Sequence, residues 1–344
     1  MNKASILLIY TGGTIGMVKN HQTGSLYPID FSLIKQELPE LKKFNCNIDS
    51  VSLPELIDSS NISPSFWVEI ANTIQKNYKK YDGFVVLHGT DTMAYSASAL
   101  SFMLDNLAKP VIFTGSQLPI GAVRTDGKEN LITAVEIAAS EKNGKPLVPE
   151  VCIYFKNKLF RGNRTTKKSV DHFNAFVSEN YPLLAEVGMS IRFHPEHFLK
   201  SNPNKELIVH KNLSSDLAIL KLFPGITENV VMNIIATPGL RGLIIETYGA
   251  GNAPTGDWFL KAMREAIHKG IIVLNITQCP SGAIQMGLYE TSLELLRMGV
   301  VSGYDMTTEA AVTKLMCLLG KELKYKQILA LLKTSMRGEV SLPA

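Results

Sequence analysis

Short runs of apolar residues recur along the chain and alternate with segments of helical periodicity. The runs of strand length are SILLIY (5–10), GFVVLH (83–88), PVIFTG (110–115), EVCIYF (150–155), LAILKLF (217–223), GLIIETY (242–248) and GIIVLNI (270–276). Segments with the spacing of an amphipathic helix lie at 64–81, 94–107, 128–140 and 255–270. A strand that is apolar throughout is covered on both faces, as in parallel sheets. The pattern therefore predicts an α/β protein with doubly wound, mostly parallel sheets.

The alternation is interrupted in one polar stretch that is rich in proline and asparagine. Residues 194–214, HPEHFLKSNPNKELIVHKNLS, show no sustained period of either kind. A chain of 344 residues is also longer than one hydrophobic core usually serves. We therefore predict a larger N-terminal domain at 1–195, a linker at 196–213 and a smaller C-terminal domain at 214–344.

Composition narrows the class of protein further. The chain is 45% hydrophobic and 19% charged, which is typical of globular proteins, and its net charge is only +4. Its basic residues are scattered, whereas a nucleic-acid partner needs a concentrated basic face. No apolar stretch approaches the ~20 residues of a membrane span, and the N-terminal MNKASILLIY leads into a glycine loop rather than a cleavage site. Four widely spaced cysteines without a CxxC motif are typical of reduced thiols. We expect a cytoplasmic protein without nucleic-acid or membrane partners.

Two of the predicted strands end in small-residue loops that carry threonine. The first strand runs into TGGTIG, which contains Thr14, and the second runs into HGTDTM, which contains Thr90 and Asp91. Ligands of open α/β sheets bind at the carboxyl ends of strands, so these loops can meet in one crevice. A third loop, RGNRTTKKS, supplies Lys167. A partly desolvated lysine can remove the proton of a threonine hydroxyl, so this set of residues predicts nucleophilic chemistry.

The same loops also fit other, purely structural roles. The glycines before Thr14 allow a sharp turn whose N–H groups can stabilise an oxyanion, but threonine and aspartate after a strand are also good helix caps. A single loop of this kind is best explained as a helix cap. Three of them, each between α/β elements, favour a catalytic site. TGGTIG fails the dinucleotide fingerprint because Thr11 stands where its first glycine is required, and neither G-x-S-x-G nor H-E-x-x-H occurs. His194 and His197 are expected to be solvated rather than metal ligands, and His88 is expected to orient or pack rather than act as a base.

At these motifs the chain resembles a known family. TGGTIG at 11–16 and HGTDTM at 88–93 resemble the two threonine signatures of the bacterial-type asparaginase/glutaminase family. The segments that resemble the cytoplasmic type I asparaginases in particular are LIDSSN (56–61), VIFTGSQLP (111–119), RGNRTTK (161–167), YGAGNAP (248–254) and TQCPSG (277–282). The resemblance covers nearly the whole chain. It implies hydrolysis of L-asparagine to L-aspartate and ammonia, with no metal or organic cofactor.

The resemblance also implies a role for each residue of the motifs. Thr14 would attack the side-chain amide carbon, polarised by Tyr27 in the loop at 18–30, and water would release aspartate from the acyl-enzyme. Thr90, Asp91 and Lys167 would form a second catalytic group, in which Asp91 also binds the substrate ammonium. Ser59 and Ser60 would hold the substrate α-carboxylate, with Asp58 beside them. The Ser116 backbone carbonyl would receive the leaving amide nitrogen.

Assembly and regulation follow from the same resemblance. Family members form dimers or dimers of dimers, in which YGAGNAP would border the site of a neighbouring subunit. Some type I enzymes have a second, regulatory asparagine pocket made partly by TQC at 277–279. Those enzymes carry a basic residue where Glu246 stands here. Because a carboxylate repels the α-carboxylate of asparagine, we expect this regulation to be absent.

Two other functions stay open at this stage. The glutaminase subunit of a tRNA-dependent amidotransferase shares both signatures, but it carries an extra N-terminal module that is not expected here, because TGGT begins at residue 11. A catalytically silent amino-acid sensor should lack a hydroxyl or the lysine, and this chain keeps Thr14, Thr90, Asp91 and Lys167. The sequence leaves the balance between asparagine and glutamine open, since one methylene is worth only ~1–3 kcal/mol in a pocket.

Overall fold

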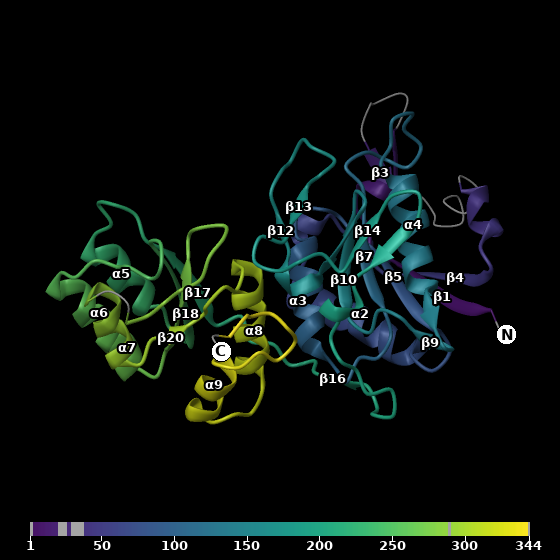
Figure 1. Ribbon diagram of the computed structural model, residues 1–344. Coiled ribbons are helices and arrows are strands. Elements are labelled where there is room, and N and C mark those ends of the chain that lie inside the picture. The colour runs from purple at the N-terminus through teal and green to yellow at the C-terminus, as the bar shows by residue number, and fades with distance from the viewer. Residues whose placement is uncertain (1–2, 20–25, 29–37, 288–289, 343–344) are drawn as a thin grey trace. The chain divides into compact units, whose positions relative to one another are not determined.

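The computed structural model describes residues 3–19, 26–28, 38–287 and 290–342. The chain divides into two compact units, Met1–Lys211 and Asn212–Ala344 (Figure 1). Each unit has a sheet and helices of its own, so the two are described separately. Within the described part of the chain, no helix has both the length and the apolar character needed to cross a membrane.

An eight-stranded sheet forms the centre of the first unit. Its strands are β1 (Ala4–Tyr10), β4 (Cys46–Ser52), β5 (Gly83–Leu87), β7 (Val111–Thr114), β10 (Val151–Phe155), β11 (Lys158–Arg161), β14 (Ala185–Val187) and β15 (Ile191–Phe193). Across the sheet, β10, β7, β5, β1 and β4 are parallel neighbours. From β10 the sheet continues through β11, β14 and β15 in antiparallel pairs. Every residue of β5, β7 and β10 is buried, as expected for parallel strands covered on both faces.

In the described part of this unit, three helices pack around the sheet: α2 (Pro64–Asn77), α3 (Met93–Met103) and α4 (Gly127–Ala139). Helix α4 contacts β1, β5 and β7, and its Leu131 shares a core cluster with Ile6 and Leu8. Helix α3 contacts β7, β10 and α2, and ten of its eleven residues are buried. A helix buried on nearly all sides shows no amphipathic stripe, which fits its alanine- and serine-rich sequence.

Short elements complete the first unit. The two-stranded pairs are β2 (Met17–Lys19) with β3 (Leu26–Pro28), β6 (Leu104–Asp105) with β16 (Ile208–Val209), β8 (Glu141–Lys142) with β9 (Lys145–Pro146), and β12 (Thr166–Lys167) with β13 (Phe176–Val177). The 3-10 turns are η1 (Thr14–Gly16), η2 (Pro39–Lys43), η3 (Ser59–Asn61), η4 (Gly162–Arg164) and η5 (Pro195–His197). Several of these short elements follow the carboxyl ends of the central strands.

Over residues 212–287 and 290–342, the second unit is a smaller parallel sheet with five helices. Its strands, in spatial order, are β17 (Leu217–Lys221), β18 (Gly242–Thr247), β19 (Ile272–Thr277) and β20 (Val301–Ser302). Its helices are α5 (Glu228–Ile235), α6 (Asp257–His268), α7 (Glu290–Met298), α8 (Thr308–Gly320) and α9 (Tyr325–Leu332). With the parallel sheet of the first unit, this confirms the predicted fold class.

The boundary between the units differs from the sequence prediction. Most of the segment expected to be a linker, 196–213, belongs to the first unit, which ends at Lys211. Its strand β16 pairs with β6, and the Leu199 N–H donates to the buried carboxylate of Glu150 at 2.8 Å. Phe198 also packs against the hydrophobic core of the unit, so hydrogen bonds and an isolated apolar contact, rather than a periodic apolar face, attach the segment.

Candidate active site

The turn that carries Thr14 is built on two glycines. After β1, Gly12 and Gly13 adopt φ of 113° and 84°, values that residues with a side chain rarely reach. A Cβ at Gly13 would lie 2.6 Å from the Gly89 Cα, and one at Gly12 would lie 2.9 Å from the Ile57 nitrogen. The backbone of the Thr14 turn therefore lies directly against the loops that follow β5 and β4.

The loop after β4 carries Ser59 and Ser60, which are predicted to hold the substrate α-carboxylate, and Asp58 beside them. Asp58 precedes η3, and its Oδ1 accepts bonds from the Ser60 N–H and the Ser60 hydroxyl, both at 2.9 Å. Both bonds lower the pKa of Asp58, and the larger effect comes from the Ser60 backbone N–H. Ser59 is buried, and a Cβ at Gly89 would lie 2.7 Å from the Ser59 Cβ. The loops after β4 and β5 are thus in contact.

Lys167 joins the third loop to the second. Its Nζ lies 2.9 Å from Thr90 Oγ1 and 2.6 Å from Asp91 Oδ1. The Lys167 side chain is 15% exposed, whereas that of Asp91 is 62% exposed, so the ammonium is sheltered and the carboxylate faces solvent. Three residues that were predicted to act as one group are therefore in direct contact. A shielded ammonium between a hydroxyl and a carboxylate is suited to moving a proton.

The hydroxyl of Thr90 does not cap a helix. Helix α3 begins at Met93 with Thr92 as its N-cap, and the Thr92 hydroxyl donates instead to the Ser59 carbonyl at 2.7 Å. Thr90 Oγ1 donates to Gln117 Oε1 at 3.2 Å and accepts from Lys167. The helix-cap alternative thus does not describe this loop.

Ser116 lies in a fourth loop, after β7, that closes on the others. Ser116 is buried, and the Asp126 carboxylate accepts the backbone N–H groups of Gln117 and Leu118 at 3.1 and 3.2 Å. Beyond this turn, the Ile120 N–H donates to the carbonyl of Ile15, next to Thr14, at 3.2 Å. The loops that hold Thr14, Ser59, Thr90, Ser116 and Lys167 therefore converge at one end of the sheet.

Tyr27 is placed only in part. Its backbone belongs to β3 and pairs with Val18 of β2, and β3 contacts η1, which begins at Thr14. The Tyr27 side chain lies outside the described residues, as do residues 20–25 and 29–30 of the loop at 18–30. The role of Tyr27 stays a prediction.

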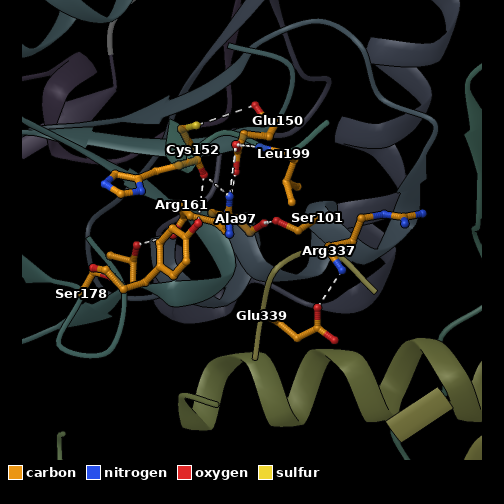
Figure 2. Close-up of polar contacts among 12 residues, drawn as sticks. Ala97, Ser101, Glu150, Cys152, Arg161, Ser178, Leu199, Arg337 and Glu339 are labelled. Atoms are coloured by element: carbon orange, nitrogen blue, oxygen red, sulfur yellow. Dashed lines mark hydrogen bonds and ion pairs between the residues drawn. The ribbon is translucent and has the colours of Figure 1, made fainter. Parts of the chain in front are cut away.

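A buried ion pair supports the loop that leads to Lys167. Arg161 Nε lies 2.7 Å from Glu150 Oε2, and the two side chains are 4% and 2% exposed (Figure 2). Arg161 Nη2 also donates to the His197 carbonyl at 2.7 Å, and the Arg161 carbonyl accepts the Thr165 hydroxyl at the same distance. Removing one partner of such a pair leaves a buried charge without a counter-ion, which lowers the free energy of unfolding by about 3–5 kcal/mol. The pair fixes β11 and the turn six residues before Lys167.

The histidines His88 and His194 lie in different surroundings. His88 is fully buried, and its Nδ1 lies 2.7 Å from the Gly89 carbonyl, so Nδ1 carries the hydrogen. Burial lowers the pKa of His88 to about 4, so the ring stays neutral near pH 7. His194 lies 3.6 Å from Glu196 Oε1, but within the described residues no group of three or more histidine, cysteine or acidic side chains is arranged to hold a metal ion.

The sequence did not single out Gln117, Asp126, Glu150 or Arg161. Gln117 and Arg161 lie inside motifs that were recognised, but their partners are 9 to 55 residues away in the sequence. Glu150 stood at the start of an apolar run, where a carboxylate with no local partner signals a buried pair.

The fold and this convergence of loops define a two-unit α/β protein with a candidate site at the carboxyl ends of its parallel strands, and comparison with known proteins gives its family. Residues 5–198 match the model of the asparaginase N-terminal domain, and residues 216–332 match that of the glutaminase/asparaginase C-terminal domain. The chain therefore belongs to the asparaginase family.

Individual members of the family are similar to this chain over nearly its whole length. The chain is 44% identical to L-asparaginase 1 of Escherichia coli K12, with 99% of each chain covered. It is 41% identical to the crystal structure of L-asparaginase I from Vibrio cholerae, with a TM-score of 0.90 over 99% of this chain and all of that one. It is also 41% identical to the mouse 60 kDa lysophospholipase, of which it covers 63%, over 98% of its own length.

Proposed function

We propose that this protein is an L-asparagine amidohydrolase in which Thr14 is the nucleophile. The observation that carries the proposal is the Lys167 ammonium in contact with both Thr90 and Asp91, beside the glycine turn of Thr14. The 44% identity to L-asparaginase 1 of Escherichia coli over nearly the whole chain supports asparagine as the substrate.

The proposed reaction proceeds through two displacements at the amide carbon. Thr14 Oγ1 attacks this carbon, and backbone N–H groups of the glycine turn stabilise the oxyanion that forms. The C–N bond then breaks, and the nitrogen leaves as ammonia after taking up a proton. A water molecule attacks the acyl-enzyme ester, the bond to Thr14 breaks, and aspartate is released. Thr90, Lys167 and Asp91 supply and remove the protons in these steps.

The substrate ends would be held by charges and hydroxyls of the same loops. The exposed carboxylate of Asp91 is available to the α-ammonium of asparagine, in addition to Lys167. Ser59 and Ser60 would bind the α-carboxylate, with the ionised Asp58 ordering the Ser60 hydroxyl. The Ser116 carbonyl would receive the leaving amide nitrogen. In this proposal the protein acts in the cytoplasm as a homodimer or a dimer of dimers.

Purified protein is expected to release ammonia faster from L-asparagine than from L-glutamine, and to do so in EDTA. The reason is that the proposed groups are side chains and backbone N–H groups of the chain itself. The measurement is steady-state ammonia release over a wide range of both substrates, with D-asparagine as a stereochemical control. Loss of activity in EDTA and its return with zinc would contradict the mechanism. Binding of asparagine without turnover would favour the sensor, and a clear preference for glutamine would favour the amidotransferase subunit.

A hyperbolic dependence of rate on asparagine concentration is also expected. In the second unit Glu246 is 8% exposed, and its carboxylate accepts the Thr308 hydroxyl at 2.8 Å and lies 3.5 Å from Lys221 Nζ. A carboxylate held in this way repels the α-carboxylate of a second asparagine. Steady-state kinetics of the native protein, Glu246→Arg and the neutral control Glu246→Gln measure this. A Hill coefficient clearly above one for the native protein would contradict the expectation. Cooperativity, if introduced, is expected in Glu246→Arg and not in Glu246→Gln.

A further inference from the structure

Gln117 connects the Thr90 hydroxyl to the loop that follows Lys167. Its Oε1 lies 3.2 Å from Thr90 Oγ1, and its Nε2 lies 3.0 Å from the Val170 carbonyl and 3.4 Å from the His172 carbonyl. Its backbone N–H is held by the buried carboxylate of Asp126 at 3.1 Å. Both ends of the residue are therefore fixed, and its side chain bridges two segments of the site.

The partners of the Gln117 amide decide how its two ends are oriented. Carbonyl oxygens only accept hydrogen bonds, so the NH₂ group must face Val170 and His172, and Oε1 must face Thr90. An amide oxygen also only accepts, so the hydrogen of the Thr90 hydroxyl points at Gln117. The remaining lone pairs of Thr90 Oγ1 are then free to accept from the Lys167 ammonium, 2.9 Å away. One ordered direction of donation results, from Lys167 to Thr90 to Gln117.

We propose that Gln117 is a positioning residue for the amide hydrolysis, acting by holding the Thr90 hydroxyl hydrogen away from Lys167. This inference rests on the proposed function, because it concerns the same proton-transfer group. Without the amide oxygen the Thr90 hydroxyl hydrogen can rotate toward the Lys167 nitrogen or the Asp91 carboxylate, which disturbs the hydrogen bond that Lys167 donates to Thr90. The lysine then loses its fixed place, and small misplacements of a catalytic group are costly in rate.

The test compares three variants by steady-state kinetics with asparagine. Gln117→Met removes both ends of the amide, and kcat should fall about 10- to 100-fold while KM changes less than about threefold. Gln117→Glu keeps an acceptor for Thr90 but loses the donors to the loop, and most of kcat should return. Ser169→Ala is the matched control. It loosens the same loop, because Ser169 Oγ accepts the N–H groups of Asp171 and His172, but it does not contact Thr90.

The outcomes separate a role through Thr90 from a role in loop structure. Equal losses of kcat in Gln117→Met and Ser169→Ala, with no recovery in Gln117→Glu, would overturn the inference in favour of loop order alone. A double mutant with Thr90→Ala gives a second measurement. Gln117→Met should have little further effect there, whereas an independent role would multiply the two losses. If the wild type is active and Gln117→Met has the same kcat, this inference alone is overturned. If the wild type does not hydrolyse asparagine, the proposed function is overturned.

Discussion

Replacement of Thr14 by alanine is expected to lower kcat by about 10⁴- to 10⁶-fold, the range seen when an enzyme loses its nucleophile. The protein should stay folded, because the turn is formed by Gly12 and Gly13 rather than by the Thr14 side chain. Ammonia release measures the loss of activity, and thermal unfolding checks the fold. Wild-type turnover in Thr14→Ala would mean that Thr14 is only a loop residue.

Two companion variants sharpen this result. Thr90→Val should lose activity to a similar degree, and Thr14→Ala combined with Thr90→Val should be little worse than the worse single variant, since residues that act as a unit are non-additive. Thr11→Val is the control in the same loop. The Thr11 hydroxyl is buried and donates to the Leu87 carbonyl at 2.8 Å, so its loss should affect stability and leave kcat near that of the wild type.

Lys167→Met is expected to abolish most activity, with kcat/KM lower by about 10²- to 10⁴-fold, whereas Lys168→Met should keep it. Lys167 contacts Thr90 and Asp91, and the next residue in the chain points to the other side of the hairpin. The Lys168 side chain is 66% exposed, and its ion pair with Glu179 has a separation of 3.8 Å. Exposed pairs of this kind are worth ~0–1 kcal/mol.

The same pair of variants tests the register of the loop. Steady-state kinetics with asparagine, together with thermal unfolding, distinguish a lost proton-transfer group from a lost fold. An inactive Lys168→Met beside an active Lys167→Met would shift the register by one residue and contradict the proposed site.

The fold was predictable from the sequence where buried strands appear as continuous apolar runs. Central strands such as β5 and β7 are apolar at every position because both of their faces are covered. Strand β4 was missed because it is an edge strand in which only Cys46, Ile48 and Val51 are partly buried, so CNIDSVS gives no apolar run. The association of residues 196–211 with the first unit was also missed, since a two-residue strand pair, individual hydrogen bonds and the packing of Phe198 give no periodic pattern.

The site was predictable where chemistry is concentrated in short motifs. Thr90, Asp91 and Lys167 were expected to form one group, and their contacts have that arrangement. Gln117 was not found, because nothing in TGSQLP shows that its amide meets a hydroxyl 27 residues earlier and a carbonyl 53 residues later. Such a role depends on tertiary contacts, which a local pattern does not encode.

The buried pair of Glu150 and Arg161 constrains how this sequence can evolve. If either residue mutates alone, the other charge is left without a partner, at a cost of about 3–5 kcal/mol out of a total stability of about 5–15 kcal/mol. A lineage that loses one charge therefore carries a protein near its stability threshold until the second position changes. Replacement of both by well-packed apolar residues is often neutral or stabilising. Natural variants are accordingly expected to keep both charges or to have replaced both, with the single replacements rare among surviving lineages.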